Sequence, residues 1–166
     1  MLSRISARLP ARTLLVAVAG IVPALAAAST VAPAAPAQAG TLTAVVYGGQ
    51  AFRATNHQRV AHDRPRLGHA TCLHRFARRQ AARMARRERI YHQDLDHVLR
   101  RCHMDFVGEN VAVGFPTGES VVDDGWMRSS EHRANILEPR FRRMEVVARR
   151  GADGRWYASQ VLGHHR

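Results

Sequence analysis

Hydrophobic residues recur at every third or fourth position between Thr71 and Glu88, and this spacing predicts the clearest helix of the chain. Thr71 is suited to cap its N-terminus, because a threonine hydroxyl accepts a hydrogen bond from a free helical N–H group. A weaker pattern predicts a helix over residues 50–61, and Pro65 separates the two helices. The apolar face of the clearer helix consists of Leu73, Phe76, Ala77, Ala81 and Met84.

In the second half of the chain, apolar and polar residues alternate in the manner of β-strands. Residues 108–114 form one such segment, and residues 144–148 and 156–162 form two more around the turn Gly151-Ala152-Asp153-Gly154, which predicts a hairpin. Helices mixed with an antiparallel hairpin imply an α+β domain or a layered α/β/α domain. Two further helices are predicted over residues 94–101 and 116–129.

The N-terminus has a different pattern. Three arginines precede an apolar stretch, residues 14–28, that is short for a membrane span, which needs about 20 residues. A segment of small residues follows and ends in Ala37-Gln38-Ala39. This order predicts a secretory signal peptide over residues 1–39 and an exported protein without a transmembrane segment after cleavage. The alternative is an uncleaved membrane anchor.

Composition narrows the class of protein. The 166 residues include 25 arginines, no lysine and 13 acidic residues, which gives a formal net charge of +12. A hydrophobic fraction of 46% supports a packed core and excludes disorder of the whole chain. Because arginine accompanies abundant alanine, glycine and proline, the basic charge partly reflects codon bias and does not by itself indicate nucleic-acid binding.

The polar face of the helix predicted over residues 71–88 is densely cationic. It is either the solvated face of a core helix or a docking surface for an anionic cell-envelope polymer or lipid headgroups. Nucleic-acid-binding surfaces often interleave charges with exposed aromatic residues, and none is interleaved here, so no specific nucleic-acid partner is predicted. The arginines of this face are Arg75, Arg78, Arg79, Arg83, Arg86 and Arg87.

Cys72 and Cys102 are the only cysteines, too few for a disulfide-rich miniprotein or a four-cysteine zinc site. In an exported protein two lone cysteines are expected to form a disulfide. Closing a loop of about 30 residues stabilises a fold by roughly 3–4 kcal/mol in the chain-entropy model. The alternative, a catalytic thiol, leaves the second cysteine without a role.

The chain lacks the nucleophile-elbow, His-Glu-x-x-His, phosphate-loop and dinucleotide-binding motifs. Three residues are candidates for a functional site: His92 after the clearest helix, Glu109 at the start of a predicted strand, and His132 after the helix over residues 116–129. Two imidazoles with a carboxylate suit zinc or another divalent cation, because neutral histidine nitrogens bind metal and the acid orients a ring or a bound water. The alternative is a set of ordinary hydrogen-bonded histidines.

Two segments resemble a known family. Residues 126–137 (Trp-Met-Arg-Ser-Ser-Glu-His-Arg-Ala-Asn-Ile-Leu) and residues 108–112 (Gly-Glu-Asn-Val-Ala) are similar to the bacterial branch of the CAP superfamily. This superfamily groups cysteine-rich secretory proteins, antigen five and pathogenesis-related proteins, and is also called SCP-like. Further similar segments are Asn56-His57-Gln58-Arg59, Tyr91-His92 and Trp156-Tyr157.

The resemblance implies an α+β fold, a three-layer α-β-α sandwich with a small antiparallel sheet and a central cleft. It covers residues 50–163, which leaves an N-terminal lead-in over residues 40–49 and a tail over residues 164–166. Relatives commonly have glycines where this chain has Glu145 and Val147, and we expect the strand to persist because valine favours strands.

Family members place two histidines and two glutamates in the cleft, and the histidines can hold a divalent cation. By motif, the resemblance assigns the histidines to His92 and His132 and the first glutamate to Glu109. Ser129 occupies the position of the second glutamate, and Glu131 lies nearby but beside the histidine.

The resemblance implies a secreted or envelope-associated binding module for a lipid, an envelope component or another ligand that the sequence does not identify. One alternative is a metal-dependent hydrolase, acting on peptides or esters, in which Glu109 is the general base on a metal-bound water. Another alternative is a protein that docks anionic envelope polymers through its arginine face. The sequence specifies neither the metal nor the oligomeric state, and the tail pair His164-His165 is suited to adventitious metal binding.

Overall fold

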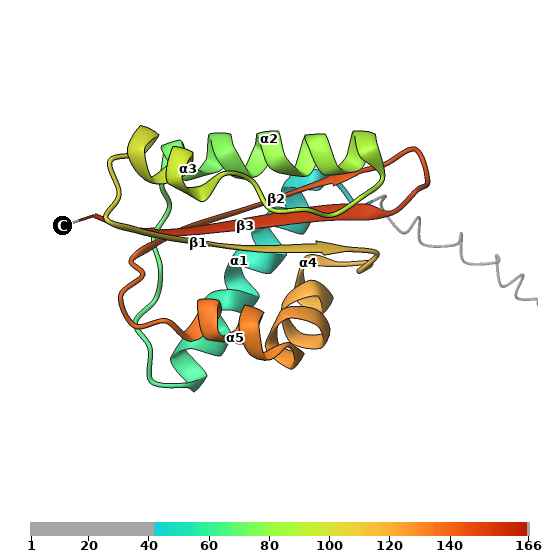
Figure 1. Ribbon diagram of the computed structural model, residues 1–166. Helices are drawn as coiled ribbons and strands as arrows, with labels where there is room; N and C mark the ends of the chain where they lie inside the picture. The colour runs from blue at the N-terminus through green and yellow to red at the C-terminus, as the bar shows by residue number, and fades with distance from the viewer. Residues whose placement is uncertain (1–41, 166) are drawn as a thin grey trace, which may run out of the picture. The chain divides into compact units, whose positions relative to one another are not determined.

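A three-stranded antiparallel sheet forms the centre of the computed structural model, which describes residues 42–165 (Figure 1). The strands are β1 (Phe106–Val113), β2 (Arg143–Arg150) and β3 (Trp156–His164), and β3 lies between the other two. The predicted hairpin is therefore present as β2 and β3. The signal peptide predicted over residues 1–39 lies outside the described residues.

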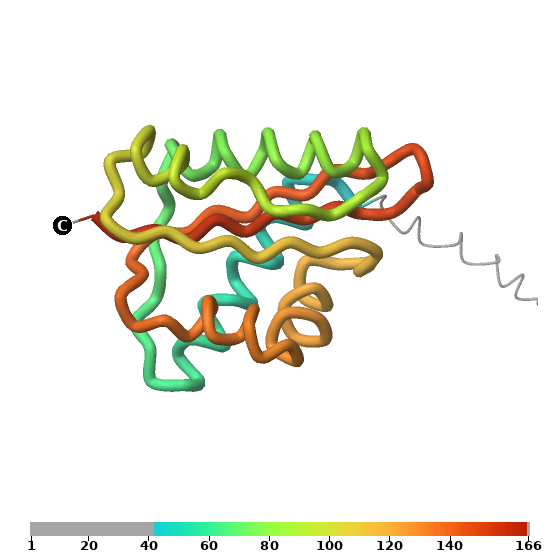
Figure 2. Tube along the Cα trace, in the orientation of Figure 1, coloured from blue at the N-terminus to red at the C-terminus, as the bar shows by residue number. Residues whose placement is uncertain are grey.

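Helices cover both faces of the sheet, which confirms the α+β sandwich (Figures 1 and 2). On one face lie α2 (Thr71–Arg87) and the short α3 (Leu95–Arg101). On the other face lie α1 (Ala44–Ala61), α4 (Gly118–Ser120) and α5 (Ser130–Leu137). No helix among residues 42–165 is long and apolar enough to cross a membrane.

Helix α1 begins at Ala44, six residues before the start of the predicted helix, so most of the predicted lead-in is helical. The Thr43 hydroxyl caps it by accepting from the Val46 N–H at 3.2 Å. The helix then passes very close to β2, since a Cβ atom on Gly48 would lie 2.7 Å from the Val146 carbonyl oxygen. Gly48, which weakens the helical pattern in the sequence, thus permits this close packing.

Helix α2 spans the predicted segment, and its predicted apolar face is buried. The predicted cap is wrong by one residue, because Thr71 is the first helical residue and Ala70 is the N-cap without a capping side chain. Instead, the Ala70 N–H donates to the Glu145 carboxylate of β2 at 2.8 Å. Strand β2 persists as expected, and Glu145 is buried there with a second contact of 3.0 Å to the His69 ring.

The single helix predicted over residues 116–129 is wrong. A turn of α4, the π-helical η1 (Val121–Gly125) and the 3₁₀ turn η2 (Trp126–Arg128) follow one another. The changes of pitch allow Val121, Val122 and Trp126 all to face the core, where each is at most 1% exposed. Helix α5 follows as an unpredicted element, so His132 lies inside a helix rather than after one.

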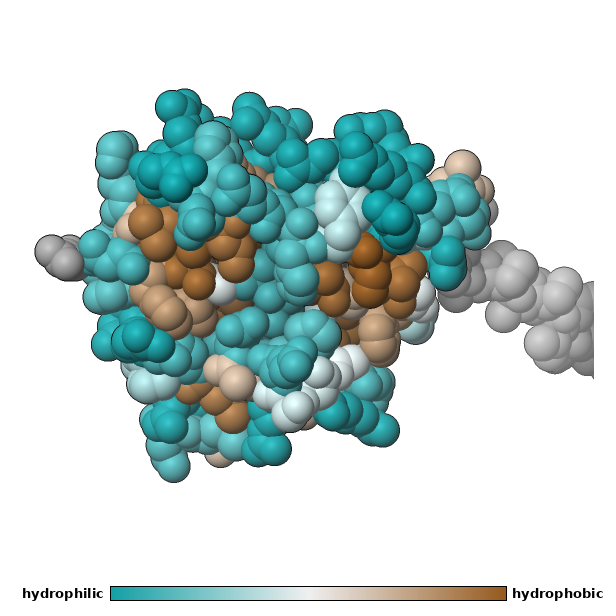
Figure 3. All heavy atoms as spheres, in the orientation of Figure 1, coloured by the Kyte–Doolittle hydropathy of each residue, from teal (hydrophilic) through white to brown (hydrophobic). Residues whose placement is uncertain are grey.

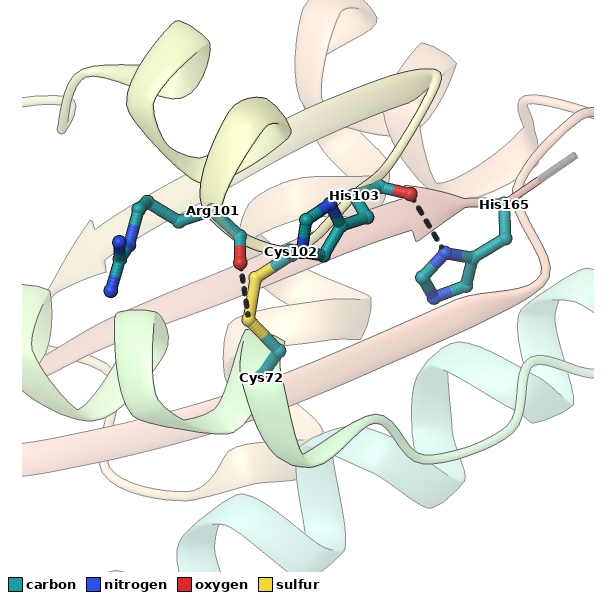
Figure 4. The surroundings of a disulfide bond; sticks show 5 residues. All are labelled: Cys72, Arg101, Cys102, His103 and His165. Atoms are coloured by element: carbon teal, nitrogen blue, oxygen red, sulfur yellow. Dashed lines mark hydrogen bonds between the residues drawn. A yellow bond between two sulfur atoms is a disulfide. The ribbon is translucent and has the colours of Figure 1, made fainter.

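The predicted disulfide between Cys72 and Cys102 is present, with an S–S distance of 2.06 Å (Figure 4). It joins the first turn of α2 to the residue that follows α3. It therefore fixes both ends of the segment that runs from α2 through His92 to the start of β1.

Candidate histidine–glutamate site

His92 lies in the loop between α2 and α3, and a buried side chain of α2 holds this loop in place. Helix α2 ends where Glu88 adopts the left-handed conformation, with φ of 49°. Gln80, fully buried on the core face of α2, donates a hydrogen bond from its amide to the Tyr91 carbonyl. The next residue, His92, keeps its side chain 58% exposed at the surface.

Glu109 on β1 is the centre of the site. Its side chain has no solvent exposure, and Oε2 lies 2.9 Å from Nδ1 of His92. The Gln93 N–H donates to the same oxygen at 3.1 Å. The other oxygen accepts from the Gln93 amide at 2.7 Å and from the Ser159 hydroxyl of β3 at 2.9 Å. Four contacts thus satisfy a buried carboxylate, which is costly to bury without partners.

This arrangement fixes the tautomer of His92. Because the carboxylate accepts, Nδ1 carries the proton, and Nε2 remains available to a ligand at the exposed edge of the ring. A carboxylate that holds the far nitrogen of a histidine is the usual support of a metal-binding imidazole. Glu109 is therefore placed as an orienting residue for His92.

His132 is half-buried in α5, and its backbone is tied to β1. Its carbonyl accepts a hydrogen bond of 3.1 Å from the side-chain amide of Asn110, the residue that follows Glu109 in β1. Burial lowers the pKa of His132 below its ordinary value of 6.5, and the neighbouring His92 lowers it further, whereas Glu131 opposes the shift. His132 therefore favours the neutral form, which is the form that binds metal.

The two family-like segments meet through a pair of asparagines, the buried Asn110 and the half-buried Asn135. The Asn135 amide donates to Oδ1 of Asn110 at 2.9 Å and to the Glu109 carbonyl at 3.2 Å. Asn110 in turn donates to Oε1 of Gln160 on β3 at 2.8 Å. Both asparagines thus have positioning roles, since they hold α5 against the part of β1 that carries Glu109.

The remaining predicted residues lie at the rim. Glu131 is exposed in the first turn of α5 and acts on the site through the charge that it presents to His132. Ser129, at the position of the missing second glutamate, is the N-cap of α5. Arg133 pairs with no acid among residues 42–165, and its guanidinium lies 3.3 Å from Nε2 of His62.

Sequence reasoning missed Gln93 and Ser159, which supply three of the four contacts to Glu109. Gln93 could have been suspected because it follows His92 in the sequence. Ser159 reaches Glu109 only because β3 pairs with β1, which the sequence does not show. Oε1 of Gln93 is buried and has no hydrogen-bond partner within residues 42–165. It is thus an acceptor beside Glu109 for a water molecule or a ligand hydroxyl.

His92 and His132 are the two residues of the site that could hold a divalent cation. His92 offers Nε2, His132 favours the neutral state, and Glu109 supports the first imidazole from behind. The described part of the chain holds no group of three or more His, Cys, Asp or Glu side chains around a common point. Water or a bound ligand would therefore complete the coordination of an ion at this site.

The predicted arginine face lies on α2. Of the named arginines, Arg83 is half-buried and donates to Oε1 of Gln80 at 2.8 Å, while the others are exposed. Figure 3 shows hydrophilic side chains crowded along the side of the molecule where α2 runs in Figure 1.

Solved structures share this fold. The chain superposes on an outer surface protein from Borrelia burgdorferi with a TM-score of 0.63 at 14% identity, covering 69% of this chain and 90% of that one. An extracellular protein containing an SCP domain from Bacillus anthracis gives a TM-score of 0.61 at 24% identity, with 71% and 40% covered. A cysteine-rich secretory protein from Staphylococcus aureus gives 0.58 at 20% identity, with 70% and 38% covered.

The chain thus spans less than half the length of the Bacillus and Staphylococcus proteins. No curated protein matches it. The model of the cysteine-rich secretory protein family, CAP, matches residues 52–161, which include His92, Glu109 and His132. The chain therefore belongs to the cysteine-rich secretory protein (CAP) family.

Proposed function

We propose that this protein is an extracellular binding module whose His92–Glu109–His132 site holds a divalent cation, with zinc as the first candidate. The observation that carries the proposal is the contact of 2.9 Å between Nδ1 of His92 and the buried Glu109 carboxylate. This contact occupies Nδ1 of an exposed imidazole and leaves Nε2 free to bind an ion, as in carboxylate-supported metal-binding histidines. When bound, the ion would supply a Lewis-acidic point to which an anionic or carbonyl ligand attaches.

Two observations support an extracellular location. The similar solved structures are named as an outer surface protein, an extracellular protein and a cysteine-rich secretory protein. The disulfide between Cys72 and Cys102 is typical of proteins in an oxidising compartment. The predicted signal peptide agrees with export.

A hydrolase with Glu109 as general base is less well supported. A base must accept a proton from the attacking water, yet both oxygens of Glu109 are engaged by His92, Gln93 and Ser159 in a side chain without solvent exposure. The second carboxylate position holds Ser129. Binding is therefore the function that the geometry favours.

Calorimetric titration of zinc into the exported protein tests the proposal. We expect one site in the wild type and none in His92→Ala/His132→Ala. Because His164 and His165 lie at the C-terminus, the control is His164→Gln/His165→Gln, which should keep the site. If zinc binds equally to the wild type and to His92→Ala/His132→Ala, or if removing the tail histidines abolishes binding, the assignment is wrong.

A further inference from the structure

A row of arginine-lined hollows follows α2 and the edge strand β2. The middle hollow, of about 280 Å³, is lined by four arginines of α2 and by Arg149 of β2. A hollow of about 240 Å³ toward the start of α2 shares Arg79 with it. A hollow of about 400 Å³ toward the end of α2 shares Arg86 and Arg149. The five arginines of the middle hollow are Arg78, Arg79, Arg83, Arg86 and Arg149.

Few of these guanidinium groups have partners. Within residues 42–165, Arg75, Arg78, Arg79 and Arg86 make no hydrogen bond or ion pair. Arg149 reaches only the neighbouring Ala148 carbonyl, at 3.4 Å. Like charges gathered around one hollow repel each other, and an anion relieves that repulsion.

The shape of the row favours a linear ligand. Arg75 and Arg86 are eleven residues apart on one helix, which places them about 16 Å apart along its axis. Within residues 42–165 the exposed large hydrophobic residues are Val45, Val46, Val60 and Ile90, and none of them lines the three hollows. The row thus lacks the apolar side chains that insert into a lipid surface.

The chemistry of the row favours phosphate without bases. Arginines reach the middle hollow from both α2 and β2, and a tetrahedral phosphate accepts from several directions whereas a carboxylate is planar. No aromatic residue lines the middle hollow or the one at the end of α2, so stacked bases have no platform in these two hollows. We propose that this row binds a linear phosphate polymer that carries no nucleobases.

The proposed polymer site shares no residue with the histidine site, and the two sites involve different edge strands of the sheet. Arg149 is on β2 and Glu109 is on β1, with β3 between them. The sequence pattern placed the cationic face on α2 alone, and Arg149 extends this face onto β2.

The test uses long-chain inorganic polyphosphate and the full exported protein. The row variant is Arg79→Gln/Arg86→Gln/Arg149→Gln, and the control of equal net charge is Arg53→Gln/Arg66→Gln/Arg128→Gln, whose arginines are exposed outside the row. We expect the row variant to lose affinity by about tenfold or more, with the salt slope reduced by about one for each arginine removed. The control should retain wild-type affinity.

Three results would overturn the proposal. The first is an equal loss of affinity in both variants, which would indicate net charge alone. The second is single-stranded DNA of matched charge binding as tightly as polyphosphate. The third is vesicles of phosphatidylglycerol and phosphatidylcholine retaining the wild type but not the row variant, while polyphosphate binds both alike. Circular dichroism and thermal unfolding of each variant verify that it is folded.

Discussion

Nδ1 of His92 lies 2.9 Å from Oε2 of Glu109, although the histidine is 58% exposed and the glutamate side chain is completely buried. The pair therefore joins a solvent-exposed side chain to a side chain buried against the sheet. Its buried member is held by β1, β3 and the loop after α2, so the orientation of the exposed ring depends on the packing of three segments.

Glu109→Gln tests this dependence. The glutamine amide places an NH₂ group toward donors that the carboxylate accepts from, on His92, Gln93 or Ser159. At least one buried hydrogen bond is therefore lost. We expect the free energy of unfolding to fall by roughly 1–3 kcal/mol and the zinc affinity to fall about 10–100-fold. Urea unfolding and calorimetry measure the two effects. The control is Glu131→Gln at the exposed rim, and equal effects of both substitutions would contradict the role assigned to Glu109.

The lowered pKa of His132 predicts how stability depends on pH. The unfolded chain, with the ordinary pKa of 6.5, binds a proton more readily than the folded chain. The free energy of unfolding should therefore decrease as the pH falls through 6.5, and this effect should be absent well above that value. Urea midpoints at about pH 7.5 and about pH 5.5 measure the decrease, and His132→Asn should reduce it. The exposed His57→Asn serves as control, and an unchanged slope in His132→Asn would contradict the prediction.

Asn110→Ala tests the junction between β1 and α5. The substitution removes one hydrogen-bond partner from each of three groups: Oε1 of Gln160, the Asn135 amide and the His132 carbonyl. We expect a loss of unfolding free energy of at least about 1–3 kcal/mol, the cost of one unsatisfied group. Zinc affinity should fall as well, because His132 loses its tie to β1. If the variant keeps the wild-type stability in urea and the wild-type zinc affinity, the positioning role assigned to Asn110 is wrong.

The disulfide makes a separate contribution to stability. Cys72 and Cys102 are 30 residues apart in the sequence, so Cys72→Ser/Cys102→Ser should lower the unfolding free energy by about 3–4 kcal/mol in the chain-entropy model. Urea unfolding with and without a reductant measures this loss. Reductant should destabilise the wild type and leave the double variant unchanged; equal midpoints for wild type and variant would contradict the prediction.

The sequence predicted α2 and the β2–β3 hairpin from their regular periodicity, and it also predicted the short helix α3. It failed where tertiary contacts override the pattern. The segment from Gly118 to Arg128 changes pitch to bury Val121, Val122 and Trp126, and no single helical period describes such a segment. Helix α1 begins before the predicted start, and its Gly48 lies against Val146 of β2, a contact that the sequence pattern does not reveal.

The same limit applies to the site. His92, Glu109 and His132 were predicted from motifs, and the structure connects the first two directly. Ser159 lies 50 residues from Glu109 and reaches it through the pairing of β1 with β3, so no local signal could identify it. Arg149 joins the arginines of α2 for the same reason, since β2 lies beside that helix.

The bond between Cys72 and Cys102 also closes a covalent ring that contains nearly all of α2, the loop with His92, and α3. A single cut by a protease inside this ring leaves the two resulting pieces linked through sulfur. Most of the arginine row and one of the two histidines therefore stay attached to the sheet after such a nick. The ring therefore gives both proposed binding surfaces a resistance to proteolysis that the folding free energy alone does not provide.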